Sequence, residues 1–123
     1  MSPRAWTHRI EDILEAVANA QTYVEGLSFE LFAADRKTVR AVAYEIGVIG
    51  EATRHIPVEV RERHPRLPWG KMQSIRNIVV HEYFRVDIGI LWETVKHDLP
   101  PLVPLLREML ASEHDDPGVN SAT

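Results

Sequence analysis

The spacing of apolar residues constrains this chain more than any other feature of its sequence. Along most of the 123 residues, large apolar side chains recur at steps of three and four, and no window shows the strict alternation of a β-strand. Such steps place side chains on one face of an α-helix, so the pattern predicts amphipathic helices that each bury one stripe. The first of these stripes consists of Trp6, Ile10, Ile13, Leu14, Val17, Ala20 and Val24.

Capping residues and prolines divide this pattern into four main helices. The second helix should end before Pro57, because the residue ahead of a proline disfavours helical geometry. The fourth should kink or restart near Asp98, because three prolines closely follow that residue within its apolar stripe. The sequence therefore predicts an all-α fold, an up-and-down bundle of four main helices plus short helical segments. The expected starts of the main helices are Pro3, Asp35, Trp69 and Asp87.

Two details of packing follow from the same pattern. A short segment, Ser28–Ala34, is expected to bury Leu31 and Phe32 ahead of the second helix. Gly47 and Gly50 lie inside the second helix, where each glycine costs about 1 kcal/mol relative to alanine. We therefore expect a neighbouring helix to approach the second helix closely at these glycines.

The extent of the apolar pattern suggests how the chain is organised. It stops near residue 110, so we expect one domain over residues 1–110 and a flexible polar tail over residues 111–123. The longest uncharged run, Ala16–Val24, is far shorter than the roughly 20 residues that span a bilayer. Acidic residues interrupt any apolar N-terminal region of the kind that a signal peptide needs. We therefore expect a soluble, cytoplasmic protein that does not enter a membrane.

The composition excludes several kinds of chemistry. There is no cysteine, which rules out a disulfide scaffold, a cysteine-based metal site and a thiol nucleophile. The six histidines show no metal-binding spacing, and the sequence has no glycine-rich phosphate loop. We therefore expect neither a metal nor another cofactor.

The charge is distributed unevenly along the chain. The net charge is −4, yet residues 54–85 hold seven Lys and Arg against three Glu, which gives +4 there and −8 elsewhere. A basic stretch in an acidic protein can form a local surface that faces phosphate groups. Charges also gather by chance on solvated faces, so the stretch alone does not decide between these interpretations.

One octapeptide holds the densest group of polar residues, with Arg76, Asn77, His81 and Tyr83. On an uninterrupted helix Tyr83 would share a face with Arg76, whereas His81 would lie about 140° round the axis from Arg76. Arg76 and His81 can then act on one substrate only if the helix unwinds near Val80 or if a second subunit supplies one of them. An ordinary helix end with caps and packing contacts would also account for these residue types.

The segment Arg-Asn-x-x-x-His-x-Tyr resembles the signature of the HEPN superfamily, specifically its HepT-like branch. Matching landmarks extend from about Ile10 to Leu102, which is most of the chain, and they occur in the family's order. The octapeptide shows no departure from the pattern. The other landmarks are Ile49-Gly50-Glu51-Ala52, Pro68-Trp69, and Val86-Asp87 followed by Trp92.

The resemblance implies a helical bundle that forms a two-fold homodimer, with the motifs of both subunits lining one cleft. It also implies a metal-independent endoribonuclease that acts on RNA, the toxin of a toxin–antitoxin pair, with Arg76, Asn77 and His81 catalytic. The partner would be an MntA-like nucleotidyltransferase antitoxin, which adds AMP to Tyr83. Glu51 is a further candidate, either as a carboxylate that pairs with Arg76 or as a solvated helix residue.

These residue types suit cleavage of RNA without a metal. The 2′-hydroxyl is the nucleophile, and an imidazole can take its proton or protonate the leaving 5′-oxygen. Arg76 would stabilise charge in the transition state and Asn77 would orient the phosphate or the imidazole, which predicts products with 2′,3′-cyclic phosphate ends. Two alternatives stay open: a non-catalytic module that binds a nucleotide or partner, and a structural protein whose polar motif holds a dimer together.

Overall fold

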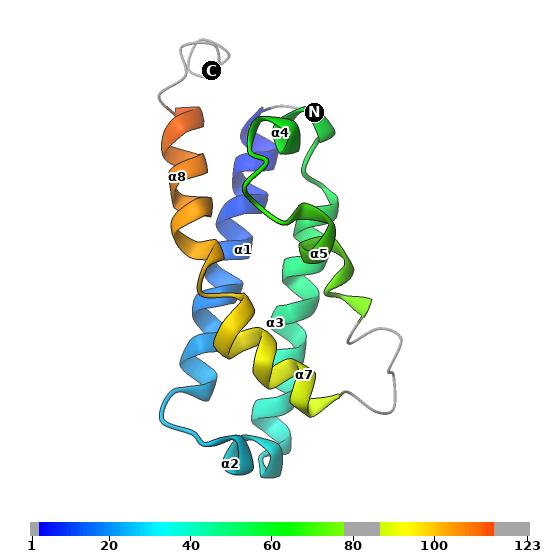
Figure 1. The fold of residues 1–123 in the computed structure, drawn as a ribbon, viewed down its shortest axis with the longest axis vertical. Coiled ribbons are helices and arrows are strands. Elements are labelled where there is room, and N and C mark those ends of the chain that lie inside the picture. Colours follow the sequence, from blue (N-terminus) through cyan, green and yellow to red (C-terminus); the bar gives the residue numbers. More distant parts are fainter. Residues whose placement is uncertain (1–2, 78–86, 115–123) are drawn as a thin grey trace.

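Two long helices form the centre of the molecule. The computed structural model describes residues 3–77 and 87–114. Helices α1 (Pro3–Val24) and α3 (Arg36–Arg54) lie side by side, and α2 (Phe29–Ala34) lies at one end of the pair (Figure 1). Their facing stripes are fully buried and form much of the core; they include Ile10, Ile13 and Val17 from α1 and Val42, Ile46 and Ile49 from α3.

The second half of the described chain packs against this pair. Helix α5 (Trp69–Ser74) and helix α7 (Ile88–Glu93) contact α3, whereas η1 (Thr94–Asp98), a π-helical turn, and α8 (Leu102–His114) contact α1 (Figure 1). The short helix α4 (Val58–Arg63) precedes α5. No strand occurs among the described residues. The predicted all-α fold is therefore confirmed.

The capping signals locate the helix starts correctly. The carboxylate of Asp35 accepts a hydrogen bond from the backbone N of Thr38 at 3.2 Å, and that of Asp87 accepts one from the backbone N of Ile90 at 3.0 Å. These bonds satisfy backbone donors that the first turn of a helix leaves without a partner. Helix α1 ends before Gly26, whose φ of +77° is a conformation that glycine adopts without strain.

The packing of α2 differs from the prediction at one residue. Phe32 is fully buried, but Leu31 is 59% exposed, so its predicted burial is wrong. Successive residues of a helix point about 100° apart, and a helix of six residues that covers the end of a bundle directs only one side toward the core.

The last helix follows the predicted break and then runs further than expected. The π-helical turn ends at Asp98, where the prolines predicted an interruption. Helix α8 then continues to His114, so the expected domain boundary at residue 110 falls inside a helix. Near its end the buried Glu113 accepts hydrogen bonds from the Arg63 guanidinium and lies 3.1 Å from His64 Nε2. None of the described helices is both long and apolar enough to cross a membrane.

Candidate catalytic site

A carboxylate near the C-terminal end of α3 gathers three cationic or titratable side chains. Glu51 Oε2 accepts a hydrogen bond from Arg54 Nη2 at 3.0 Å and lies 3.1 Å from His55 Nε2. Its other oxygen, Oε1, accepts a hydrogen bond from Arg76 Nη1 at 3.2 Å. Arg54 and His55 follow Glu51 by three and four residues, which places all three side chains on one face of the helix. Of the two interpretations of Glu51, the structure therefore contains the pairing with Arg76.

The neighbouring side chains lower the pKa of the Glu51 carboxyl group. The hydrogen bond from Arg54 is the largest cause that lowers this pKa below its ordinary value, followed by the contact with His55. The carboxylate is therefore ionised whenever the solution is near neutral. One negative charge then lies between the permanent positive charges of Arg54 and Arg76, which leaves a positive excess.

Gly50 explains how Arg76 can lie against α3. A Cβ atom at residue 50 would lie 2.7 Å from the Cβ atom of Arg76, closer than real Cβ atoms approach, and 3.0 Å from its backbone N. At Gly47, one turn earlier, a Cβ atom would meet none of the described residues within 4 Å. The expected close approach is therefore confirmed at Gly50, and no described segment makes such an approach at Gly47.

The segment that approaches Gly50 is a turn rather than a long helix. Helix α5 ends at Ser74, and Arg76 lies in the turn that follows it. The third helix, which was expected to start at Trp69, is therefore interrupted at Ile75 and Arg76. Contact with α3 fixes the backbone of Arg76, and tertiary contacts of this kind routinely override local helix preference.

Further contacts hold α5 in place beneath this turn. The indole Nε1 of the buried Trp69 donates to the carbonyl oxygens of His64 at 2.9 Å and Arg61 at 3.2 Å. The Arg61 guanidinium donates to the carbonyl oxygen of Thr53 and to Oε1 of Gln73, both at 3.0 Å. These bonds link α3, α4 and α5, so the position of Arg76 depends on a rigid base.

A pocket of about 350 Å³ opens beside Arg76. We call it the arginine pocket, because two arginines and no acidic residue line it within the part of the chain that the structure describes. The Arg76 side chain is 34% exposed and Arg54 is 51% exposed, so both can meet a ligand from solvent. The lining residues are Arg54, Gly70, Gln73, Ser74, Arg76 and Asn77.

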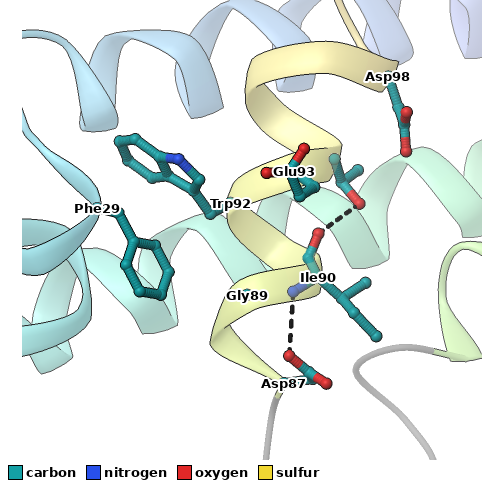
Figure 2. A pocket seen from close by; sticks show the side chains of 8 residues that line it. Phe29, Asp87, Gly89, Ile90, Trp92, Glu93 and Asp98 are labelled. Atoms are coloured by element: carbon teal, nitrogen blue, oxygen red, sulfur yellow. Dashed lines mark hydrogen bonds between the residues drawn. The ribbon is translucent and has the colours of Figure 1, made fainter.

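A second pocket, of about 570 Å³, lies between α2 and α7 and has a different lining (Figure 2). We call it the aromatic pocket, because Phe29 and Trp92 form one wall, with ring centres 5.9 Å apart. Carboxylates of Asp87, Glu93 and Asp98 also line it. Three negative charges repel a phosphate, so this pocket does not suit an RNA backbone.

The basic stretch from residue 54 does not form one continuous cationic surface in the part of the chain that the structure describes. Arg63 binds the buried Glu113, Arg66 lies 3.8 Å from Glu108, and Lys71 lies 3.7 Å from Asp98. These side chains have intramolecular partners far from Arg76 in the sequence. Arg54 and Arg76 share the arginine pocket, whereas Arg63 and Arg66 line another pocket, of about 260 Å³, together with the carboxylate of Glu108.

The structure brings together some of the predicted site residues and adds others. Arg76 and Asn77 line the arginine pocket, and Glu51 binds Arg76, whereas His81 and Tyr83 lie outside the described residues. Sequence reasoning counted Arg54 only as part of the basic stretch, and it considered His55 only as a metal ligand. The signal that could have found them is their spacing of three and four residues from Glu51.

Comparison with known proteins places the chain in a family. The family model described as "Ribonuclease HepT-like" matches residues 13–109. A protein of Thermococcus cleftensis named "Probable ribonuclease HepT" is 41% identical over 93 residues, which cover 76% of this chain and 84% of that protein. A protein of Caldanaerobacter subterraneus subsp. tengcongensis, named as a "Putative RNase", is 36% identical over 104 residues, or 85% of this chain and 93% of that protein.

A third relative agrees with the first two. It is a protein of Methanocaldococcus jannaschii, also named as a "Putative RNase", and is 34% identical over 102 residues, or 83% of this chain and 94% of that protein. No solved structure matches the chain. The matched region contains Gly50, Glu51 and the whole octapeptide from Arg76 to Tyr83. The chain belongs to the HepT-like ribonuclease family of the HEPN superfamily.

Proposed function

We propose that this chain is a metal-independent endoribonuclease, the toxin of a toxin–antitoxin pair, which cleaves RNA in the cytoplasm with Arg76, Asn77 and His81. The observation that supports this proposal most strongly is the Arg76 guanidinium, which Glu51 holds at 3.2 Å on the rim of a pocket that a second arginine, Arg54, also lines. Membership of the HepT-like family supplies the class of reaction.

The proposed reaction needs no nucleophile from the protein. The 2′-oxygen of one nucleotide attacks the adjacent phosphorus, and the bond from phosphorus to the 5′-oxygen of the next nucleotide breaks. His81 takes the 2′-hydroxyl proton, and a protonated imidazole returns a proton to the leaving 5′-oxygen. The products are a 2′,3′-cyclic phosphate and a 5′-hydroxyl.

Arg76 stabilises the charge that develops on the phosphoryl oxygens during this reaction. One of its N–H groups is bound to Glu51, and its remaining N–H groups have no partner within residues 3–77 and 87–114. A guanidinium can bind two phosphate oxygens at once, and a donor that is already oriented requires no reorganisation when the charge appears. Glu51 therefore acts as a positioning residue for Arg76, and Asn77 orients the phosphate or the imidazole.

We further propose that two copies of the chain form a two-fold dimer, in which the motifs of both subunits line one cleft. In this arrangement His81 of one subunit serves as the base and His81 of the other serves as the acid. This division of labour also meets the geometric requirement that Arg76 and His81 act on one phosphate.

The activity is proposed to be controlled by modification of Tyr83. An MntA-like nucleotidyltransferase antitoxin would catalyse attack of the Tyr83 hydroxyl oxygen on the α-phosphorus of ATP, with release of pyrophosphate and a proton. The attached AMP would add a negative charge and a purine close to Arg76, which would exclude RNA by charge and bulk. Tyr83→Phe should keep nuclease activity and escape the antitoxin; full silencing of this variant would favour simple occlusion.

The test compares two histidine variants in EDTA. Wild-type protein made without an antitoxin, and shown by intact mass to be free of AMP, is incubated with a broad RNA pool beside His81→Ala and His97→Ala. His97, on the π-helical turn, is a matched control. Its side chain is 69% exposed, and its Nε2 atom lies 3.5 Å from Oε2 of Glu93. Wild type and His97→Ala should cleave, and His81→Ala should not. Folded, unmodified wild type that leaves the pool intact would favour the non-catalytic binding module.

A further inference from the structure

We infer that the arginine pocket is a subsite that binds the phosphate of a nucleotide next to the one that is cleaved. This inference rests on the proposed function and extends it to residues outside the octapeptide. The residues concerned are Arg54 on α3 and Gly70 and Gln73 on α5, which line the pocket together with Arg76.

The side chains at the pocket present hydrogen-bond donors. Arg61 Nη1 donates to Gln73 Oε1 at 3.0 Å, so the carbonyl end of the Gln73 amide is turned toward Arg61. Its NH₂ group has no partner among the residues that the structure describes and can donate to a ligand. Together with the guanidinium groups of Arg54 and Arg76, this amide forms a set of donors that matches the oxygen atoms of a phosphodiester.

One carboxylate fixes both guanidinium groups of the pocket. Glu51 Oε2 holds Arg54 at 3.0 Å and Glu51 Oε1 holds Arg76 at 3.2 Å. Glu51 therefore fixes both guanidinium groups next to each other. RNA that contacts Arg76 at the cleavage position would also contact Arg54. A pocket whose donors are already oriented loses less conformational entropy when a ligand binds.

The described residues that line the pocket can bind a phosphate, but they cannot transfer the protons that cleavage requires. No imidazole, carboxylate or amine is found among the lining residues that the structure describes, so none of these side chains exchanges a proton with a 2′-hydroxyl near neutral pH. His55 is nearby, but it contacts Glu51 and does not line the pocket. A phosphate in this pocket would therefore be held without being cleaved, as a neighbouring nucleotide of the substrate should be.

Gly70 offers a way to fill the pocket without disturbing the fold. It lines the pocket, and a Cβ atom at residue 70 would meet none of the described residues within 4 Å. Its φ is not in the left-handed region, so other residues are tolerated there. Gly70→Glu adds a large side chain with a negative charge, and Gly70→Gln adds a side chain of the same size without the charge. Gly70→Ala adds only a methyl group.

Binding is measured first, by fluorescence anisotropy of a labelled 12-nucleotide single-stranded RNA whose 2′-positions are methylated so that it cannot be cleaved. The full chain is used, and thermal unfolding shows whether each variant is folded. We expect Gly70→Glu and Arg54→Gln to raise the Kd about fivefold or more, Gly70→Gln to raise it less, and Gly70→Ala to raise it least of the three substitutions at this glycine. Arg107→Gln, which removes the same charge from the exposed face of α8, should stay within about twofold.

Two binding results would overturn the inference. Equal effects of Arg54→Gln and Arg107→Gln would mean that overall charge, and not this pocket, binds the RNA. An unchanged Kd in both Gly70→Glu and Gly70→Gln would mean that RNA does not enter the pocket. In addition, competition by AMP as effective as that by the unlabelled 12-mer would assign the pocket to a free nucleotide instead of a neighbouring RNA phosphate.

Cleavage then separates failure of the subsite from failure of the proposed function. The ratio of kcat/KM for a cleavable 12-mer to that for a dinucleotide should fall about fivefold in Gly70→Glu and Arg54→Gln, because only the longer substrate reaches the pocket. An unchanged ratio would overturn the subsite while leaving the nuclease intact. If wild type cleaves neither substrate, the proposed function fails, and the binding experiment still decides whether RNA occupies the pocket.

Discussion

The arginine pocket and the aromatic pocket differ both in volume and in the charge of the residues that line them. The aromatic pocket is larger, about 570 Å³ against about 350 Å³, but three carboxylates line it. The described lining of the arginine pocket has two arginines and no acidic residue. Because RNA is a polyanion, the charge of the lining residues decides which pocket can bind it, and the volume of the pocket does not.

The two pockets also differ in how the chain builds them. The aromatic pocket takes seven of its eight lining residues from 87–98, within or next to one short stretch of helix, and the rings of Trp92 and Phe32 pack 5.2 Å apart beneath it. The arginine pocket depends on contacts between residues 25 positions apart, Glu51 and Arg76. A site of this kind is sensitive to the docking of α5 on α3.

The largest difference between the two regions should appear in cleavage. Arg76→Gln removes the charge proposed to stabilise the transition state and should lower kcat about 100- to 1000-fold, the usual cost of losing one such donor. Glu93→Gln in the aromatic pocket should leave kcat within about twofold. Single-turnover kinetics on one defined RNA in EDTA measures both, and equal rates for Arg76→Gln and wild type would remove Arg76 from the mechanism.

The next largest effect should be on stability at the contact that positions Arg76. Gly50→Ala forces a Cβ atom against the Arg76 backbone, and overpacking of this kind costs about 1–3 kcal/mol. Gly47→Ala meets no described residue within 4 Å and should instead stabilise the helix by about 0.5–1 kcal/mol. Urea unfolding of the two variants checks the opposite signs. A stabilised Gly50→Ala would mean that Arg76 does not lie this close to α3.

These two glycines show where sequence reasoning reached its limit. The apolar stripes and the capping aspartates specify local structure, so the starts of α3 and α7 could be predicted from Asp35 and Asp87. Gly47 and Gly50 have the same local context, and only the neighbour in space distinguishes them. The sequence could not reveal which glycine faces another segment.

The same limit applies to the candidate site. Arg76 and Asn77 could be proposed from the octapeptide, but the partner of Glu51 is 25 residues away, so pairing and solvation remained equal alternatives. The participation of Gln73 depends on the orientation that Arg61 gives its amide. Neither contact leaves a periodic pattern in the sequence, because each joins side chains from different helices or turns.

A moderate effect is expected from removing the charge that anchors Arg76. Glu51→Gln should lower kcat about tenfold, equivalent to about 1.4 kcal/mol, because the guanidinium loses its fixed orientation. A positioning role predicts that kcat falls more than KM changes and that Glu51→Asp restores part of the rate. Loss of thermal stability without a change in kcat would make Glu51 a structural residue only.

The smallest effect is expected at a cluster remote from both pockets. Burial of Glu113 raises its pKa, but the hydrogen bonds from Arg63 and His64 outweigh burial, so the pKa lies below its ordinary value. A lowered folded-state pKa contributes stability above the unfolded pKa of about 4.3, and that contribution is lost as the pH falls through the folded value.

Glu113→Gln should therefore lower the free energy of unfolding by about 1 kcal/mol at neutral pH, with cleavage unchanged. The difference from wild type should shrink as the pH falls below about 4. Thermal unfolding across this range measures the trend. A difference that grows with acidity would show that the Glu113 pKa is raised instead.

The most direct test of the central claim is the chemical identity of the RNA ends that purified wild-type protein produces in EDTA. Attack by the 2′-oxygen beside Arg76 predicts 2′,3′-cyclic phosphate and 5′-hydroxyl ends, with the same ends from Glu93→Gln and very little product from Arg76→Gln. Products with 3′-hydroxyl and 5′-phosphate ends, or cleavage that requires an added divalent metal, would contradict it.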